Sequence, residues 1–244
     1  MTDLRLLDEV SWRGTALPGG RTQALLAALV SAGGQVGEER LVDEVWGADG
    51  APANPAKALQ VVVSRARAQT APEVVARTDH GYRLGLRPDQ VDALALRDAV
   101  VGARDAEGHH DVVRARDLAR AALALPAPGS ADEGPLGELR ATAARHRSVA
   151  SAVLGRSLSA LGDHDEALAL LVEAAAGDET SVAALLRSLA AVHGVPAALD
   201  RYERHRSELA DRLGVDPGPV LQAVHGELLA ADRPVRGQQL AGRS

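Results

Sequence analysis

The sequence contains no cysteine and no phenylalanine, and aromatic residues make up only 2% of its 244 positions. Without cysteine, neither disulfide bonds nor cysteine-ligated metal sites can form, which suits a reducing cytoplasm. Without phenylalanine, the hydrophobic core must consist mainly of leucine, valine and alanine. The N-terminus lacks the basic and apolar regions of a signal peptide, and charges interrupt every apolar run well before the roughly 20 residues of a membrane span. We therefore expect a cytoplasmic protein with no membrane contact.

Motifs of enzymes and of metal or nucleotide sites are also missing. The sequence contains neither the HExxH spacing of zinc proteases nor the GxxxxGK[ST] loop that cradles phosphates. The run His109-His110-Asp111 has no matching nucleophile motif, and an exposed turn between helices is the simpler interpretation. We predict no catalytic residue, no metal site and no cofactor, so the protein is not expected to be an enzyme.

Charge is distributed unevenly along the chain. The whole sequence has a net charge of -6, but residues 53–88 hold six basic and two acidic residues, a net charge of +4, which leaves -10 for the rest. A basic patch on an acidic protein is typical of a nucleic-acid contact. Residues 1–90 as a whole are nearly neutral, with 10 basic and 11 acidic residues. That balance favours an alternative, in which this region docks onto another protein.

The first ninety residues combine helices with short strands. Apolar spacing predicts helices over 21–32 and 38–46. A third helix follows Asn54, which can cap it, with Pro55 at its first position. Extended segments are expected at 4–10, 74–76 and 82–86. The last two flank a tight turn and therefore form a hairpin. The predicted order of elements is two helices, a polar loop, a basic helix and a hairpin. This is the order of a winged helix-turn-helix domain, whose last helix enters the DNA major groove.

The basic helix, residues 57–69, carries no acidic side chain. Helical spacing assigns four residues to the side that faces the core: Leu59, Val62, Val63 and Ala66. The opposite side consists of Lys57, Gln60, Val61, Ser64 and Arg65. Arginine can bind guanine, glutamine can bind adenine and valine can contact the thymine methyl group, while lysine and serine suit phosphates. This side is either a DNA-reading surface or an ordinary solvated helix face, and the order of elements favours the first.

From residue 89 onward the chain has helical periodicity almost throughout. Helices are predicted over 90–106, 110–125, 136–161, 164–176, 180–193, 196–213 and 217–231. Ala167 and Ala198 occupy matching places in two of them, and small residues there let paired helices approach closely. We predict tetratricopeptide-like helix pairs, with apolar stripes that bury Leu168, Leu171 and Leu199. Residues 233–244 are polar and are expected to form a flexible tail.

Several segments also resemble a known family. Arg40-Leu-Val-Asp-Glu-Val-Trp46-Gly, Ala58-Leu-Gln-Val-Val-Val-Ser-Arg-Ala-Arg67 and Gly81-Tyr82-Arg83-Leu84 are similar to the OmpR-type DNA-binding domain of antibiotic regulatory proteins of the SARP family. Leu213-Gly-Val-Asp-Pro-Gly-Pro219-Val-Leu221 resembles the end of that family's bacterial transcriptional activator domain. The resemblance covers about residues 4–232. It implies a small α+β winged helix-turn-helix domain at 1–88, an all-α tetratricopeptide-like domain at 89–232 and the tail at 233–244.

The resemblance also implies site residues. The recognition-helix contacts of the family correspond here to Lys57, Gln60, Val61, Ser64, Arg65 and Arg67. Trp46, at the end of the second helix, corresponds to a position near the DNA backbone, and a core tryptophan is an equally good interpretation. In the hairpin, the corresponding wing residues are Arg77, Thr78 and Arg83.

The function implied by the resemblance is sequence-specific activation of transcription of secondary-metabolite (antibiotic) biosynthesis genes. Such a protein binds direct repeats in double-stranded promoter DNA, self-associates there as two head-to-tail copies, and recruits RNA polymerase subunits in the nucleoid. An isolated fragment of residues 1–90 would then keep the sequence preference and lose affinity. The alternative is a protein-interaction module or ligand sensor in which the winged helix no longer reads DNA.

Overall fold

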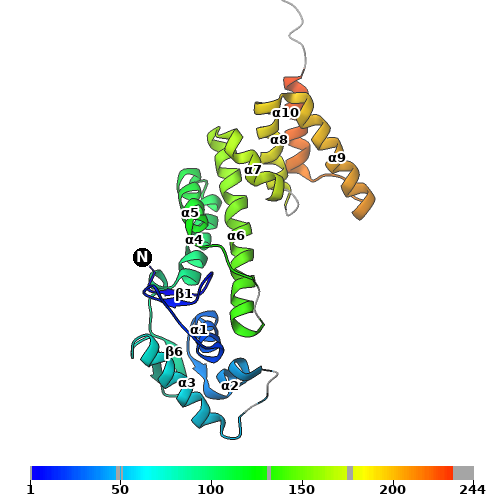
Figure 1. The fold of residues 1–244 in the computed structure, drawn as a ribbon. Helices are drawn as coiled ribbons and strands as arrows, with labels where there is room; N and C mark the ends of the chain where they lie inside the picture. The colour runs from blue at the N-terminus through cyan, green and yellow to red at the C-terminus, as the bar shows by residue number, and fades with distance from the viewer. Residues whose placement is uncertain (1, 48–49, 51, 131–132, 175–177, 233–244) are drawn as a thin grey trace, which may run out of the picture. The chain divides into compact units, whose positions relative to one another are not determined.

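The computed structural model describes residues 2–47, 50, 52–130, 133–174 and 178–232. It forms two compact units, Met1–Ala150 and Ser151–Ser244, which are described separately (Figure 1). Among the described residues, none of the helices is long and apolar enough to cross a membrane. The predicted tail, 233–244, lies outside the described residues.

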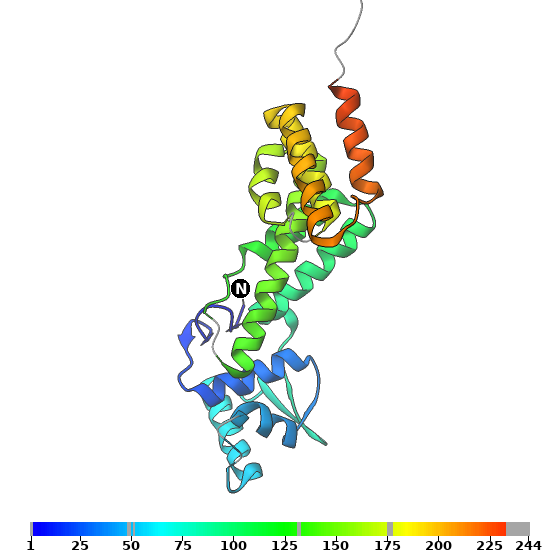
Figure 2. The same ribbon diagram turned by 90° about the vertical axis from the view of Figure 1, so that its right-hand side faces the viewer.

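The first unit begins with short strands and three helices. Strands β1 (Leu4–Arg5), β2 (Ser11–Trp12) and β3 (Thr15–Ala16) form an antiparallel sheet in that order. There follow α1 (Gly20–Ala32), β4 (Val36–Gly37), α2 (Glu38–Trp46), α3 (Pro55–Gln69), β5 (Val75–Thr78) and β6 (Gly81–Leu84). The three helices pack against one another, and β4, β6 and β5 form a second antiparallel sheet (Figure 2). This is the predicted winged helix-turn-helix arrangement.

The same unit continues into helices that the sequence assigns to the second domain. A short 3-10 helix, Pro88–Gln90, leads into α4 (Asp92–Gly108) and α5 (Val112–Ala124), and α6 (Gly134–Leu161) runs from the first unit into the second. One hydrophobic cluster joins Leu29 of α1 and Leu59 of α3 to Leu96 of α4 and Leu139 of α6. The core of the first unit is therefore shared between the winged helix and the helices that follow it.

Local sequence accounts well for α3 and for the wing. The Asn54 side chain accepts a hydrogen bond from the backbone N–H of Lys57 at 3.0 Å, which confirms the predicted cap. The predicted hairpin is confirmed by the antiparallel pairing of β5 with β6. Gly81 stands where β4 passes closest: its φ is +151°, and a Cβ there would lie 2.0 Å from the carbonyl oxygen of Val36. Only glycine fits that position of the Gly-Tyr-Arg-Leu motif.

The extended segment predicted at 4–10 is wrong beyond its first residues. Only Leu4–Arg5 is a strand, and the next residues are held by side chains that lie far along the sequence. The buried carboxylate of Asp92 accepts hydrogen bonds from the backbone N–H groups of Leu6 and Leu7 at 3.0 Å. Arg140 donates to the carbonyl oxygens of Leu6 and Asp8. Burial raises the pKa of Asp92, and the backbone N–H groups that bind the ionised carboxylate oppose this effect.

The second unit consists of helices that pack in pairs. After the end of α6 come α7 (His164–Ala174), α8 (Glu179–His193), α9 (Val195–Leu213) and α10 (Pro219–Ala231). α7 packs on α8, α8 on α9, and α10 on both α8 and α9. Among the described residues, the predicted helices begin and end within two residues of the observed ones. The end predicted for the helix 164–176 lies outside the described residues. Ala167 and Ala198 are fully buried, as expected for close helix packing in a tetratricopeptide-like domain.

The register of the buried side chains differs from the prediction. Leu171 is fully buried, but Leu168 and Leu199 are only half-buried. The buried positions of α7 are Ala167 and Leu171, which are four residues apart and therefore share one narrow face. The apolar stripe of α7 is wider than the surface that covers it, so Leu168 lies at its edge.

The segment that closes the helical domain has a glycine at the start of its last helix. Pro219 begins α10, and Gly218 caps it. The backbone N–H of Gly218 donates to the Glu179 carboxylate of α8 at 2.7 Å. A Cβ at position 218 would lie 2.3 Å from the other carboxylate oxygen. The Pro-Gly-Pro sequence thus brings the start of α10 close enough for Glu179 to bind it.

Candidate nucleic-acid interface

Helix α3 has one buried and one exposed side, as its sequence predicts. Leu59, Val62, Val63 and Ala66 are buried against α1 and α2. Five residues on the other side are exposed: Lys57, Gln60, Val61, Ser64 and Arg65. Val61, the large apolar side chain among these five, keeps 51% of its surface accessible. The exposed side is therefore a continuous polar surface with one apolar residue in it.

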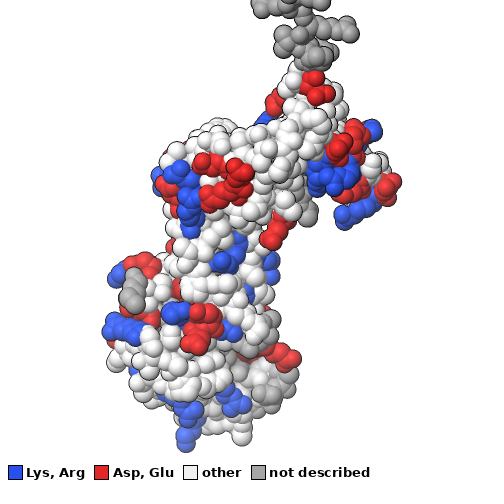
Figure 3. All heavy atoms as spheres, turned by 45° about the horizontal axis from the view of Figure 1, so that its top comes forward, with Lys and Arg blue, Asp and Glu red and all other residues white. Residues whose placement is uncertain are grey.

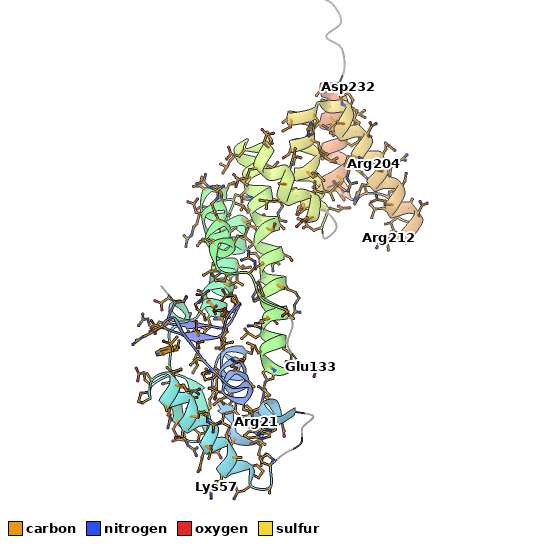
Figure 4. The ribbon with its side chains drawn as sticks, in the orientation of Figure 1. Arg21, Lys57, Glu133, Arg204, Arg212 and Asp232 are labelled. Carbon is orange, nitrogen blue, oxygen red and sulfur yellow. The ribbon has the colours of Figure 1, made fainter. Side chains whose placement is uncertain are left out.

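The basic residues of this exposed side have no acidic partners. Lys57 and Arg65 form no side-chain hydrogen bond or ion pair with any residue that the structure describes. By contrast, Arg40 on α2 is paired with Glu44 at 2.7 Å, and Arg87 is paired with Asp89 at 3.1 Å. Figure 3 shows basic side chains without acidic neighbours along the lower edge of this unit, and Figure 4 places Lys57 at the start of α3. The side chains of Lys57 and Arg65 are thus available to bind an anion.

Arg67 is placed differently from the other residues of the helix. Its guanidinium donates from Nε and Nη2 to the carbonyl oxygen of Val75, at 2.9 and 2.7 Å. The side chain is half-buried and ties α3 to the first strand of the wing. These contacts of Arg67 therefore position the hairpin, and they use two of the five N–H groups of its guanidinium.

Arg77 on β5 holds the wing to α2. It donates to the hydroxyl of Tyr82 at 2.7 Å, and its Nη1 lies 2.5 Å from the carboxylate of Glu38. The guanidinium also lies over the Tyr82 ring, 4.8 Å from its centre. The hydrogen bond with Tyr82, aided by Glu38, holds the pKa of Arg77 above its usual range. These contacts fix the angle of the hairpin beside α3.

The remaining predicted residues are spread around this site. Arg83 is exposed and makes a single long hydrogen bond, 3.3 Å, to the neighbouring carbonyl of Leu84. Thr78 is half-buried, and its hydroxyl has no hydrogen-bond partner among the described residues. Trp46 is 6% exposed and belongs to the core, which matches the second of its two interpretations.

Sequence reasoning did not single out Arg21 or Glu38. The guanidinium of Arg21, at the start of α1, lies 5.1 Å from the centre of the Trp46 ring (Figure 4). Glu38 is the partner of Arg77. No local signal identifies either pairing, because the partners lie 25 and 39 residues away along the chain. Within the described ranges, no group of three or more histidine, aspartate or glutamate side chains could hold a metal ion.

The protein belongs by its fold to the winged-helix regulators of transcription, since three helices pack together, the third carries no acidic residue, and a hairpin adjoins it. Here a helical repeat domain follows the winged helix. Residues 91–229 match the family model described as bacterial transcriptional activator domain. The chain is 32% identical to the transcriptional regulator RedD of Streptomyces coelicolor, over 92% of this chain and 68% of that protein. The chain belongs to the SARP family of antibiotic regulatory proteins, which are transcriptional regulators and not enzymes.

Two further likenesses agree with this assignment. The regulatory protein AfsR of Streptomyces coelicolor is 33% identical over 91% of this chain, which spans only 23% of AfsR. The structure of Mycobacterium tuberculosis EmbR, solved in complex with a low affinity phosphopeptide, superposes with a TM-score of 0.73. That match covers 95% of this chain and 66% of the EmbR chain at 23% identity, and it shows a shared two-part fold.

Proposed function

We propose that the protein is a sequence-specific DNA-binding activator that reads the major groove with the exposed side of α3. The observation that carries this proposal is the division of α3 into a buried apolar side and an exposed side with two unpaired cations and no acid. A carboxylate on that side would face the phosphates of the DNA and weaken binding. Arg83 on the wing is a third exposed cation of the same unit.

The finer parts of the function follow from the family and from the small size of the site. One winged helix offers few phosphate contacts, so a single copy binds weakly at physiological salt. Two copies on adjacent direct repeats gain affinity through effective concentration if the helical domain holds them together. Once bound, they recruit RNA polymerase subunits to antibiotic biosynthesis genes. The protein acts in the cytoplasm, at the nucleoid.

Arg65 is expected to read a base. Arg65→Ala should weaken binding to the operator by about 1–3 kcal/mol, roughly 5- to 150-fold, and relax sequence preference, because a bidentate contact is lost. Ser64→Asp should weaken binding to every sequence, because it places a negative charge beside phosphate. A gel-shift titration on the promoter nearest the gene measures both. Arg87→Ala is the matched control, since Arg87 is also exposed but is paired with Asp89. Unchanged affinity of both variants, with circular dichroism intact, would remove α3 from the interface.

Lys57 is expected to contact phosphate and not a base. Lys57→Gln should lower affinity about equally on operator and unrelated DNA. It should also reduce the slope of log affinity against log salt by about 1, because one fewer counterion is released. Titrations at several salt concentrations measure that slope. A slope equal to that of the wild type would place Lys57 outside the DNA contact, and no salt dependence at all would favour the protein-docking alternative.

A further inference from the structure

The second unit contains a groove that DNA binding does not use. It lies along α9, with Val172 of α7 on its other side, and has a volume of about 300 Å³. Its residues on α9 extend from Arg201 to Leu213. From Arg201 to Leu213 the helix rises about 18 Å, so the groove is long. That length matches about three helical turns of a partner.

The polar part of the groove is basic and lacks partners. Three basic side chains, Arg201, His205 and Arg212, line it together with one acid, Glu208. Among the described residues, neither Nη1 of Arg201 nor Nε2 of His205 has a hydrogen-bond acceptor, although both atoms are buried. Burial and the nearby charge of Arg201 lower the pKa of His205, and Glu208 and Glu179 oppose this effect. The groove therefore carries the two guanidinium charges of Arg201 and Arg212 against the one carboxylate of Glu208.

The apolar part of the groove is exposed to solvent. Val172 and Leu213 keep 66% and 68% of their surfaces accessible, and Leu209 between them is half-buried. No helix among the described residues covers the last two turns of α9, and Figure 4 shows Arg212 at this end of the helix. Exposed apolar side chains that line a concave surface beside unpaired cations are typical of a binding site.

The chemistry of this groove selects its occupant. Unpaired guanidinium groups bind carboxylates, while Val172, Leu209 and Leu213 bind aliphatic side chains. Both requirements are met by a helix with leucine-like residues on one face and Asp or Glu flanking them. Within the described residues, the most acidic helix is α2. Its apolar residues are buried in the core of the first unit, so α2 cannot occupy the groove. We propose that the groove between α7 and α9 binds an acidic amphipathic helix of another protein.

The proposal is tested by selecting peptides on the full-length protein. Random 14-residue peptides are displayed and selected on wild-type protein, and the enriched peptides are then titrated against variants. We expect enriched sequences to combine Asp or Glu with apolar residues at helical spacing. Arg201→Gln with Arg212→Gln should weaken their binding at least about tenfold, because two charge-assisted contacts are lost. Leu213→Asp should also weaken peptide binding, because it removes an apolar contact in the groove. Leu213 is exposed, so this substitution leaves the fold intact.

The control removes the same charge elsewhere in the unit. Arg187→Gln with Arg206→Gln eliminates two exposed arginines outside the groove, whose partners are Glu227 and Glu203. This variant should bind the peptides as the wild type does. Enriched peptides without acidic residues, no enrichment at all, or equal binding by the Arg201→Gln/Arg212→Gln variant would overturn the proposal. So would a wild-type dimer that the groove variants dissociate, since a second copy would then be the occupant. Operator binding should be unchanged in every groove variant, which separates this test from that of α3.

Discussion

A fragment that ends at residue 90 is expected to lack a cooperative unfolding transition, whereas a fragment of residues 1–150 is expected to unfold cooperatively. The shorter fragment contains all three helices and both strands of the winged helix hairpin. It lacks Asp92 and Arg140, which bind the backbone of residues 6–8. It also lacks Leu96 and Leu139, which share the core of the first unit.

The size of the expected effect follows from these losses. Without Asp92, the N–H groups of Leu6 and Leu7 lose their hydrogen bonds to a buried carboxylate, and each bond to a charged group contributes about 1.5–3 kcal/mol. Each missing core leucine exposes apolar surface on α1 and α3 that costs a further few kcal/mol. Because a domain is stable by only about 5–15 kcal/mol, the sum removes most or all of the stability.

Tryptophan fluorescence measures the outcome directly. Both tryptophans of the chain, Trp12 and Trp46, are buried in the first unit, so their emission reports on its folding in urea. The boundary between residues 88 and 89 stays a prediction, and these two fragments test it. If the 1–90 fragment unfolds cooperatively at the same urea concentration as the 1–150 fragment, the contacts from α4 and α6 are dispensable. The loss of DNA affinity expected for 1–90 would then have to come only from the missing helical domain, which holds two copies together.

Leu171→Ala is expected to lower the free energy of unfolding by about 2–5 kcal/mol, the cost of a large-to-small change in a core. Leu171 is 0% exposed and packs against Gly155 of α6, where no side chain can move in to fill the space. Urea unfolding followed by circular dichroism measures the change.

Leu168→Ala is the matched comparison on the same helix. It removes the same atoms three residues away, but Leu168 is half-buried, so its loss should cost clearly less. Equal costs for the two variants would contradict the observed register of α7. A larger cost for Leu168→Ala would instead support the register that the apolar stripe alone predicts, in which Leu168 is buried.

The sequence predicted most of the secondary structure because those signals are local. Helix bounds follow from apolar spacing, from the Asn54-Pro55 start of α3 and from glycine at helix ends. The two faces of α3 were predictable for the same reason, since positions three and four residues apart share a side of any helix. The wing followed from two extended segments around a tight turn. Family membership followed from motifs that lie within short segments of the chain.

The tertiary structure alone decided which of these side chains are free to act. Arg65 and Arg67 look alike in the sequence, but Arg67 binds the carbonyl of Val75 and Arg65 binds nothing in the described chain. Arg77 is a basic wing residue by position, yet Glu38 of α2 and Tyr82 hold it. Such pairings join residues that are remote along the chain, so no local pattern encodes them. Periodicity and capping are properties of neighbouring residues, whereas burial, ion pairs and grooves arise only when distant elements pack together.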